Sequence, residues 1–240
     1  MAMNAGRWVL DVGNTRVKFA HRTSEGEMFV LQDDEALERA QNLEFVPEAV
    51  LVAASGELSE AWKALCQRWT TRCIHVSASD ALFFPRSYTP PESLGLDRIA
   101  NALAAGTSGT WAIVDAGTCI TCDLVKHGVF CGGSIAPGLA MRLHAMHHGT
   151  ARLPRWEVDD VEDCALGTTT SSSMGAGALH GARLEVQGRI AEWHAAHPEL
   201  RVAVTGGDAP RLAISTSVPI FADPFLTLRG YHLLLNRMLP

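Results

Sequence analysis

The chain has 240 residues, of which 47% are hydrophobic and 19% charged, and its formal net charge is −6. This composition is ample for a packed core, argues against disorder, and suits one large domain or two smaller ones. An acidic chain is poorly suited to binding nucleic acid or an anionic membrane, so we expect neither partner. Any phosphate site must therefore be built locally, from backbone N–H groups, a few basic side chains and metal ions.

Targeting signals are not apparent. No apolar run approaches the about 18 residues that a membrane-spanning helix needs. Residues 1–14 contain no apolar segment long enough for a signal peptide. The six cysteines are then best explained as reduced thiols. We expect a soluble protein of the cytoplasm.

The first half of the chain alternates predicted strands and helices. Residues 8–10 form an apolar strand, Gly13 and Asn14 a turn, and residues 16–19 a return strand of period two. Further along, we expect a helix over 33–43, a strand over 49–55, a helix over 58–69 and a strand over 73–77. A proline-containing loop then leads into a helix that begins near Leu96.

The pattern of the opening hairpin returns from Thr110 onward. Apolar residues again lead to an acid, a small residue, a glycine and a hydroxyl residue, before an alternating strand. Asp115 corresponds to Asp11 and Gly117 to Gly13, at one common spacing. We infer an internal duplication, with halves over 1–106 and 107–240.

The second half continues the alternation. A glycine-rich segment (132–138) precedes a predicted helix over 139–148, a hydroxyl-rich turn over 167–177 and a long helix over 178–196. A strand over 201–207 and a C-terminal helix over 224–239 complete the chain. Strands and helices alternate in both halves, so the fold class is α/β.

An acid at the end of an apolar strand, followed at once by a glycine turn, has two explanations. It can be an Asx turn that caps a hairpin. It can also be a phosphate site, in which the glycine lets the backbone approach a ligand, turn N–H groups face phosphate oxygens, and Asp11 holds hydrated Mg²⁺. The second copy favours phosphate binding, because two acids at equivalent positions of related halves would face one another across a cleft.

Two linked D-x-G-[NT] hairpins resemble the acetate and sugar kinase, Hsp70 and actin superfamily. Within it, the chain resembles the type III pantothenate kinases. The matching segments are "DVGNTRVK" (11–18), "SYTPPESLGLDRIANALAA" (87–105), "DAGTCIT" (115–121), "GGSIAPG" (132–138), "GTTTSSSMGAG" (167–177) and "VTGGDA" (204–209). The resemblance implies two ribonuclease-H-like, actin-like ATPase halves around an ATP cleft. It also implies phosphorylation of pantothenate to 4′-phosphopantothenate, the first step of coenzyme A biosynthesis.

The resemblance further assigns roles to single residues. Asp97 would be the general base that takes the proton of the attacking hydroxyl, although an acid there could also simply favour the helix dipole. Arg98 would bind the substrate's carboxylate. The full set of implied substrate contacts is Tyr88, Gly95, Leu96, Asp97, Arg98 and Thr170. Tyr88 could instead be a packing residue and Thr170 a helix N-cap, and Thr169 could take the place of Thr170.

The nucleotide and its cations have their own implied contacts. ATP would lie between the halves with Mg²⁺ at its phosphates, and Asp115 would coordinate a monovalent cation, K⁺ or NH₄⁺. The implied ATP contacts are Asp11, Val12, Gly13, Asn14, Thr15, Arg16, Val17, Lys18 and Thr118. The helix after "GGSIAPG" could hold an anion at its N-terminus, and "TGGDA" would lie beside the nucleoside. A homodimer is expected by analogy.

Other readings of the sequence are weaker. Cys119 and Cys122 have the spacing of half a zinc knuckle, but no second pair follows, so buried thiols are favoured. His144, His147 and His148 share helical spacing, but no acid nearby completes a set of metal ligands, which favours a solvated helix end.

Two alternative functions remain, a kinase of another small hydroxylated substrate and a non-catalytic factor in transcription. A general base and both hairpin acids argue against the latter.

Overall fold

The structure is a computed structural model that describes residues 5–69 and 72–239. The chain divides into two compact units, one made of residues 1–106 with 225–240 and the other of residues 107–224. The C-terminal helix, which the sequence analysis placed with the second half, thus lies in the first unit. None of the helices within the described ranges is long and apolar enough to cross a membrane.

The first unit contains a five-stranded sheet in the order β3-β2-β1-β4-β5. Its strands are β1 (Arg7–Val12), β2 (Val17–Arg22), β3 (Met28–Gln32), β4 (Ala49–Ala54) and β5 (Cys73–Val76). The first three form an antiparallel meander, and β4 and β5 run parallel to β1. Strand β3 was not predicted from the sequence.

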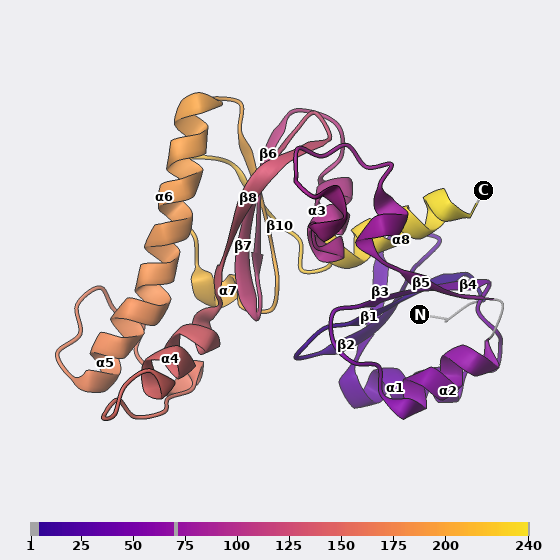
Figure 1. The fold of residues 1–240 in the computed structure, drawn as a ribbon, viewed down its shortest axis with the longest axis horizontal. Helices are drawn as coiled ribbons and strands as arrows, with labels where there is room; N and C mark the ends of the chain where they lie inside the picture. Colours follow the sequence, from indigo (N-terminus) through magenta and orange to yellow (C-terminus); the bar gives the residue numbers. More distant parts are fainter. Residues whose placement is uncertain (1–4, 70–71, 240) are drawn as a thin grey trace. The chain divides into compact units, whose positions relative to one another are not determined.

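Helices cover both faces of this sheet (Figure 1). They are α1 (Asp33–Gln41), α2 (Glu60–Arg68), α3 (Leu96–Ala105) and α8 (Leu226–Met238), with 3₁₀ turns η1 (Ala78–Ala81) and η2 (Pro91–Ser93) between β5 and α3. Coverage on both faces explains why β1 is apolar at successive positions rather than alternating. Trp8 and Leu10 face α1 and α2, and Val9 is buried on the side of α8.

An aromatic cluster forms the core beneath α1 and α2. The ring of Phe19 stacks on Trp8 with centroids 4.4 Å apart and on Trp69 at 5.7 Å. On the other face, α8 is held to its neighbours by polar contacts as well as by its buried leucines. The hydroxyl of Thr227 donates to Asn101 Oδ1 of α3 at 2.8 Å. These contacts explain why the last helix belongs to the first unit.

The second unit repeats this topology. Its sheet has the order β10-β9-β6-β7-β8. The strands are β6 (Thr110–Ala116), β7 (Cys119–Lys126), β8 (Val129–Pro137), β9 (Arg201–Thr205) and β10 (Ile220–Ala222). Again three strands form an antiparallel meander and two run parallel to the first of them. Each strand of the first sheet therefore has a counterpart in the second, as the inferred duplication predicts.

The helices of the second unit pack on the apolar face of its sheet, with α6 as the longest (Figure 1). They are α4 (Leu139–His148), α5 (Thr170–Gly175), the π-helical turn η4 (Ala176–His180), α6 (Gly181–Ala196) and α7 (Ala209–Leu212), with a 3₁₀ turn η3 (Val158–Asp160). The predicted long helix therefore begins earlier than expected, with α5, and is interrupted by η4. The glycine-rich segment belongs to β8 up to Pro137, and β10 was not predicted.

Candidate active site

The first acid-tipped turn joins β1 to β2. Asp11 is the penultimate residue of β1 and lies in register with Lys18 of β2 and Ala53 of β4. The N–H of Gly13 closes the turn by donating to the carbonyl of Arg16 at 2.9 Å. The turn residues from Asn14 to Arg16 are exposed. The structure thus places a partly buried carboxylate beside an exposed loop of backbone.

The end of β4 supports this turn from the side. The carbonyl of Val12 accepts the N–H groups of Ser55 at 2.9 Å and Gly56 at 3.1 Å. A Cβ at Gly56 would lie 2.6 Å from the carbonyl oxygen of Gly13. Only a glycine lets the chain leave β4 this close to the hairpin.

The second acid-tipped turn has the same place in its own sheet. Asp115 is the penultimate residue of β6 and lies in register with Thr121 of β7 and Thr205 of β9. The N–H of Gly117 donates to the carbonyl of Cys119 at 3.0 Å, and Thr118 is exposed. Asp115, Thr121 and Thr205 therefore present oxygen atoms on the sheet face opposite the apolar core.

The "TGGDA" segment follows β9 and packs on this second turn. The carbonyl of Ala116 accepts the N–H of Asp208 at 2.9 Å, as Val12 accepts from Ser55 in the first unit. Gly206 has φ +98°, and its Cα lies against the backbone of Ala116, where a side chain would clash. The segment expected near a nucleoside therefore also shapes the hairpin turn.

The predicted substrate contacts of the first unit gather at the start of α3. Arg98 is only 4% exposed, and its guanidinium lies 5.7 Å from the centre of the Tyr88 ring. Asp97 is exposed in the first turn of α3, and its Oδ1 accepts the N–H of Arg98 at 2.9 Å. Gly95 is the N-cap, followed by Leu96. The structure brings a buried cation, an aromatic ring and an accessible carboxylate into one local group.

The structure of the hydroxyl-rich turn distinguishes Thr169 from Thr170, between which the sequence did not decide. Thr169 is the N-cap of α5, and its hydroxyl accepts the N–H of Ser172 at 3.1 Å. Ser172 in turn accepts the N–H of Thr169 at 3.0 Å, which completes a capping box. Thr170 is exposed on the first turn. The capping role considered for Thr170 thus belongs to Thr169.

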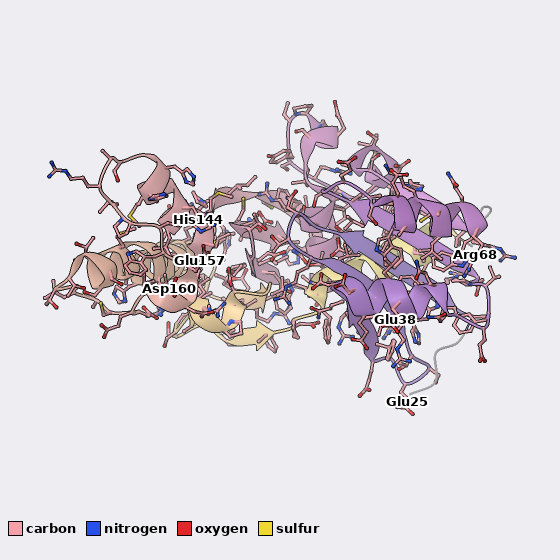
Figure 2. The ribbon with its side chains drawn as sticks, turned by 90° about the horizontal axis from the view of Figure 1, so that it is seen from below. Glu25, Glu38, Arg68, His144, Glu157 and Asp160 are labelled. Atoms are coloured by element: carbon pink, nitrogen blue, oxygen red, sulfur yellow. The ribbon has the colours of Figure 1, made fainter. Side chains whose placement is uncertain are left out.

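The structure also bears on the cysteine and histidine patterns. Cys122 is buried, and burial raises the pKa of its thiol to about 12, so it is not a ready metal ligand. His144 Nε2 lies 3.0 Å from Glu157 Oε2, and the two side chains are labelled near one another in Figure 2. His147 and His148 each bond to a backbone carbonyl instead. Across the described residues, no group of three or more His, Cys, Asp or Glu side chains could hold a metal ion.

Sequence comparison covers most of the chain. Residues 8–192 match the sequence model of the type III pantothenate kinase family. A type III pantothenate kinase from Bacteroides fragilis is 35% identical over 237 residues, which cover 95% of this chain and 96% of that protein. The enzyme of the same name from Christiangramia forsetii is 32% identical and covers 95% and 97%.

Similar solved structures agree with this fold. A Campylobacter jejuni protein named for the Baf family of transcriptional activators is 25% identical, with a TM-score of 0.62 over 96% of this chain and 98% of that one. A glucokinase from an Antarctic psychrotroph, 11% identical, has a TM-score of 0.50 over 96% and 98% of the two chains and supports the fold alone. The two five-stranded units thus have the same fold as that glucokinase. Taken with the match along residues 8–192, these findings show that the chain belongs to the type III pantothenate kinase family.

Proposed function

We propose that this protein transfers the γ-phosphoryl group of ATP to the primary hydroxyl of pantothenate, which yields 4′-phosphopantothenate and ADP. The observation that carries the proposal is the pair of acid-tipped turns, Asp11 on β1 and Asp115 on β6, at equivalent places of two duplicated sheets. Family membership supports the choice of substrate.

The first turn is the proposed phosphate site. Its contacts with ATP are the residues from Asp11 to Lys18, and Thr118 adds one from the second unit. The donor set fits Mg²⁺, because a carboxylate oxygen at a strand end lies beside exposed backbone that can face phosphate oxygens. When bound, Mg²⁺ neutralises phosphate charge as it develops. Asp11 holds that ion directly or through water.

The second turn is the proposed site of a monovalent cation, K⁺ or NH₄⁺. Asp115 supplies the charge. The hydroxyl oxygen of Thr121, its neighbour across β6 and β7, is buried and has no hydrogen-bond partner within the described residues. A buried polar atom left in this state is costly, and a cation would satisfy it.

The start of α3 is the proposed substrate site. Arg98 binds the carboxylate of pantothenate, with Tyr88 and Thr170 as further contacts and Gly95 and Leu96 as backbone contacts. Asp97 accepts the proton of the substrate hydroxyl as its oxygen forms the bond to the γ-phosphorus and ADP leaves. An accessible carboxylate is what this step requires, and Asp97 is exposed.

The test is an ADP-release assay with pantothenate, run in K⁺ and then in Na⁺. Asp97→Asn should lower kcat by about 10²- to 10⁴-fold, because the amide cannot accept the proton. Glu192→Gln, an exposed residue of α6, is the control and should retain wild-type turnover. Undiminished turnover in Asp97→Asn would show that Asp97 is not the general base. Equal rates in K⁺ and in Na⁺ would show that Asp115 does not bind a required monovalent cation.

Two other functions can be separated from this one. A panel of small hydroxylated acids and sugars would reveal a kinase with a different substrate. The name of the Campylobacter jejuni relative raises a role in transcription, but the net charge of −6 disfavours DNA binding.

We also propose a cytoplasmic homodimer that binds neither nucleic acid nor membrane. Light scattering would measure the mass of the assembly.

A further inference from the structure

We infer that Gln32 and Asp33, at the junction of β3 and α1, are positioning residues that hold the first hairpin turn in the shape that binds nucleotide. The inference rests on the proposed role of that turn as the phosphate site. It adds two residues that lie outside the matched segment "DVGNTRVK". Neither residue need touch the ligand.

The strand register explains how these residues reach the turn. Lys18 and Gln32 are the last pair of the β2–β3 ladder. A continued ladder would set Val17 opposite Asp33, but at Asp33 the chain turns away into α1. The carboxylate Oδ1 of Asp33 accepts the N–H of Val17 at 3.0 Å and so extends the ladder by one bond. A side chain thus holds the first residue of β2, directly after the turn.

Gln32 makes the neighbouring contact. Its Oε1 accepts a hydrogen bond from Nη1 of Arg16 at 3.1 Å. Arg16 is the last turn residue, and its carbonyl accepts the N–H of Gly13. The two side chains therefore hold consecutive residues at the far end of the turn. The near end is held through the carbonyl of Val12, which accepts the N–H groups of Ser55 and Gly56 and, at 3.4 Å, the hydroxyl of Ser55.

The backbone of Asp33 indicates that its side chain matters. Its φ is +52°, in the left-handed region that residues other than glycine seldom adopt. Glycine would adopt this conformation without steric cost, but it has no acceptor. Aspartate and asparagine are the side chains that tolerate it best and that also carry an acceptor oxygen. The residue type present is one of the two that meet both requirements.

The second unit offers an internal comparison. There, too, the hairpin turn is held from the start of the helix that follows the third strand. Gly138, the N-cap of α4, donates its N–H to the carbonyl of Thr118 at 3.1 Å. The second unit thus supports its turn at Thr118 through backbone atoms, and the first unit supports its turn at Arg16 and Val17 through two side chains. Support at this place is therefore common to both halves, and in the first it can be removed by substitution.

The experiment compares Asp33→Gly, which keeps the backbone conformation and loses the acceptor, with Asp33→Asn, which keeps both. Asp34→Gly is the matched control, because it adds a glycine and removes a carboxylate one residue further along α1. The readouts are KM for ATP, KM for pantothenate, kcat, the Kd for Mg·ATP by calorimetry, and the thermal midpoint.

Asp33→Gly should raise KM and Kd for ATP about three- to tenfold, the effect of one lost hydrogen bond, with KM for pantothenate unchanged and the thermal midpoint equal or higher. Asp33→Asn and Asp34→Gly should both bind ATP like wild type. Gln32→Ala, which needs no special backbone, should give a smaller shift in the same direction. Wild-type affinity in Asp33→Gly would overturn the inference, and so would a uniform loss of stability and of both affinities.

The calorimetric readout separates this inference from the proposed function. If the wild type binds ATP but does not phosphorylate pantothenate, the substrate assignment fails, while the Kd values still decide the role of Asp33. If it phosphorylates pantothenate and Asp33→Gly binds ATP normally, only the inference fails. A wild type without measurable ATP binding refutes both.

Discussion

Gly56 offers the sharpest test of how the fold shapes the proposed phosphate site, through the substitution Gly56→Ala. The added Cβ would lie 2.6 Å from the carbonyl oxygen of Gly13, well inside the 3.4 Å at which ordinary van der Waals contact begins. The neighbour is backbone, so it cannot rotate away as a flexible side chain would. Either the hairpin turn or the end of β4 must move.

The magnitude follows from that displacement. Overpacking of this kind costs about 1–3 kcal/mol of folding free energy. The hydrogen bonds that the N–H groups of Ser55 and Gly56 donate to the carbonyl of Val12 lie on the same segment and would lengthen with it. A misplacement of about 1 Å can lower catalysis by about 10²-fold. We therefore expect Gly56→Ala to be less stable and to lose most of its kcat/KM for ATP.

The control is another glycine with free space around it. Gly188 lies within α6, and a Cβ there would meet nothing within 4 Å. Gly188→Ala should stabilise the protein by about 0.5–1 kcal/mol, because alanine favours helix more than glycine does. Urea denaturation and steady-state kinetics measure both variants. A Gly56→Ala protein with wild-type stability and wild-type kcat/KM would show that this close approach does not shape the turn.

Two further predictions concern stability. Burial lowers the pKa of both His21 and His232 below the ordinary value of 6.5, so each stays neutral in the folded protein where the unfolded chain binds a proton. The stability that comes from keeping these two histidines neutral is therefore full above pH 6.5 and is lost as the pH falls from there toward the folded pKa. Denaturation curves from about pH 8 to about pH 5 should show a falling denaturation midpoint. A denaturation midpoint that rises on acidification would contradict this sign. Phe19→Ala should cost about 3–5 kcal/mol in the same assay, because the ring is fully buried and stacks on two tryptophans, whereas a cost below about 1 kcal/mol would mean that this cluster does not carry the core.

Much of the candidate site could be predicted from local sequence. An acid at a strand end and a glycine after it are neighbours in the chain, so the turn they form needs little outside information. For this reason Asp11 and Asp115 lie where the pattern predicted, each at the penultimate position of a central strand. The group formed by Asp97, Arg98 and Tyr88 was suggested by a motif, and the structure adds the proximity of the ring to the buried guanidinium.

Other features depend on partners that are distant in sequence. Strand β3 has no distinctive pattern and exists because β2 offers an edge with which to pair. The three threonines from Thr168 to Thr170 have equal propensity to cap a helix, and the contacts of Ser172 select Thr169. The roles of Gln32 and Asp33 were invisible in the sequence because their contacts with the turn depend on strand register.

By itself, therefore, the sequence determined the α/β class, the duplication and the two acid-tipped turns. Each of these features depends on residues that lie a few positions apart or on a pattern that recurs at one spacing. Only the tertiary structure decided that the last helix returns to the first unit and that side chains at the junction of β3 and α1 contact the turn after β1. An amphipathic helix can bury its apolar face against any complementary surface, so the free energy of packing selects its partner, and periodicity alone does not.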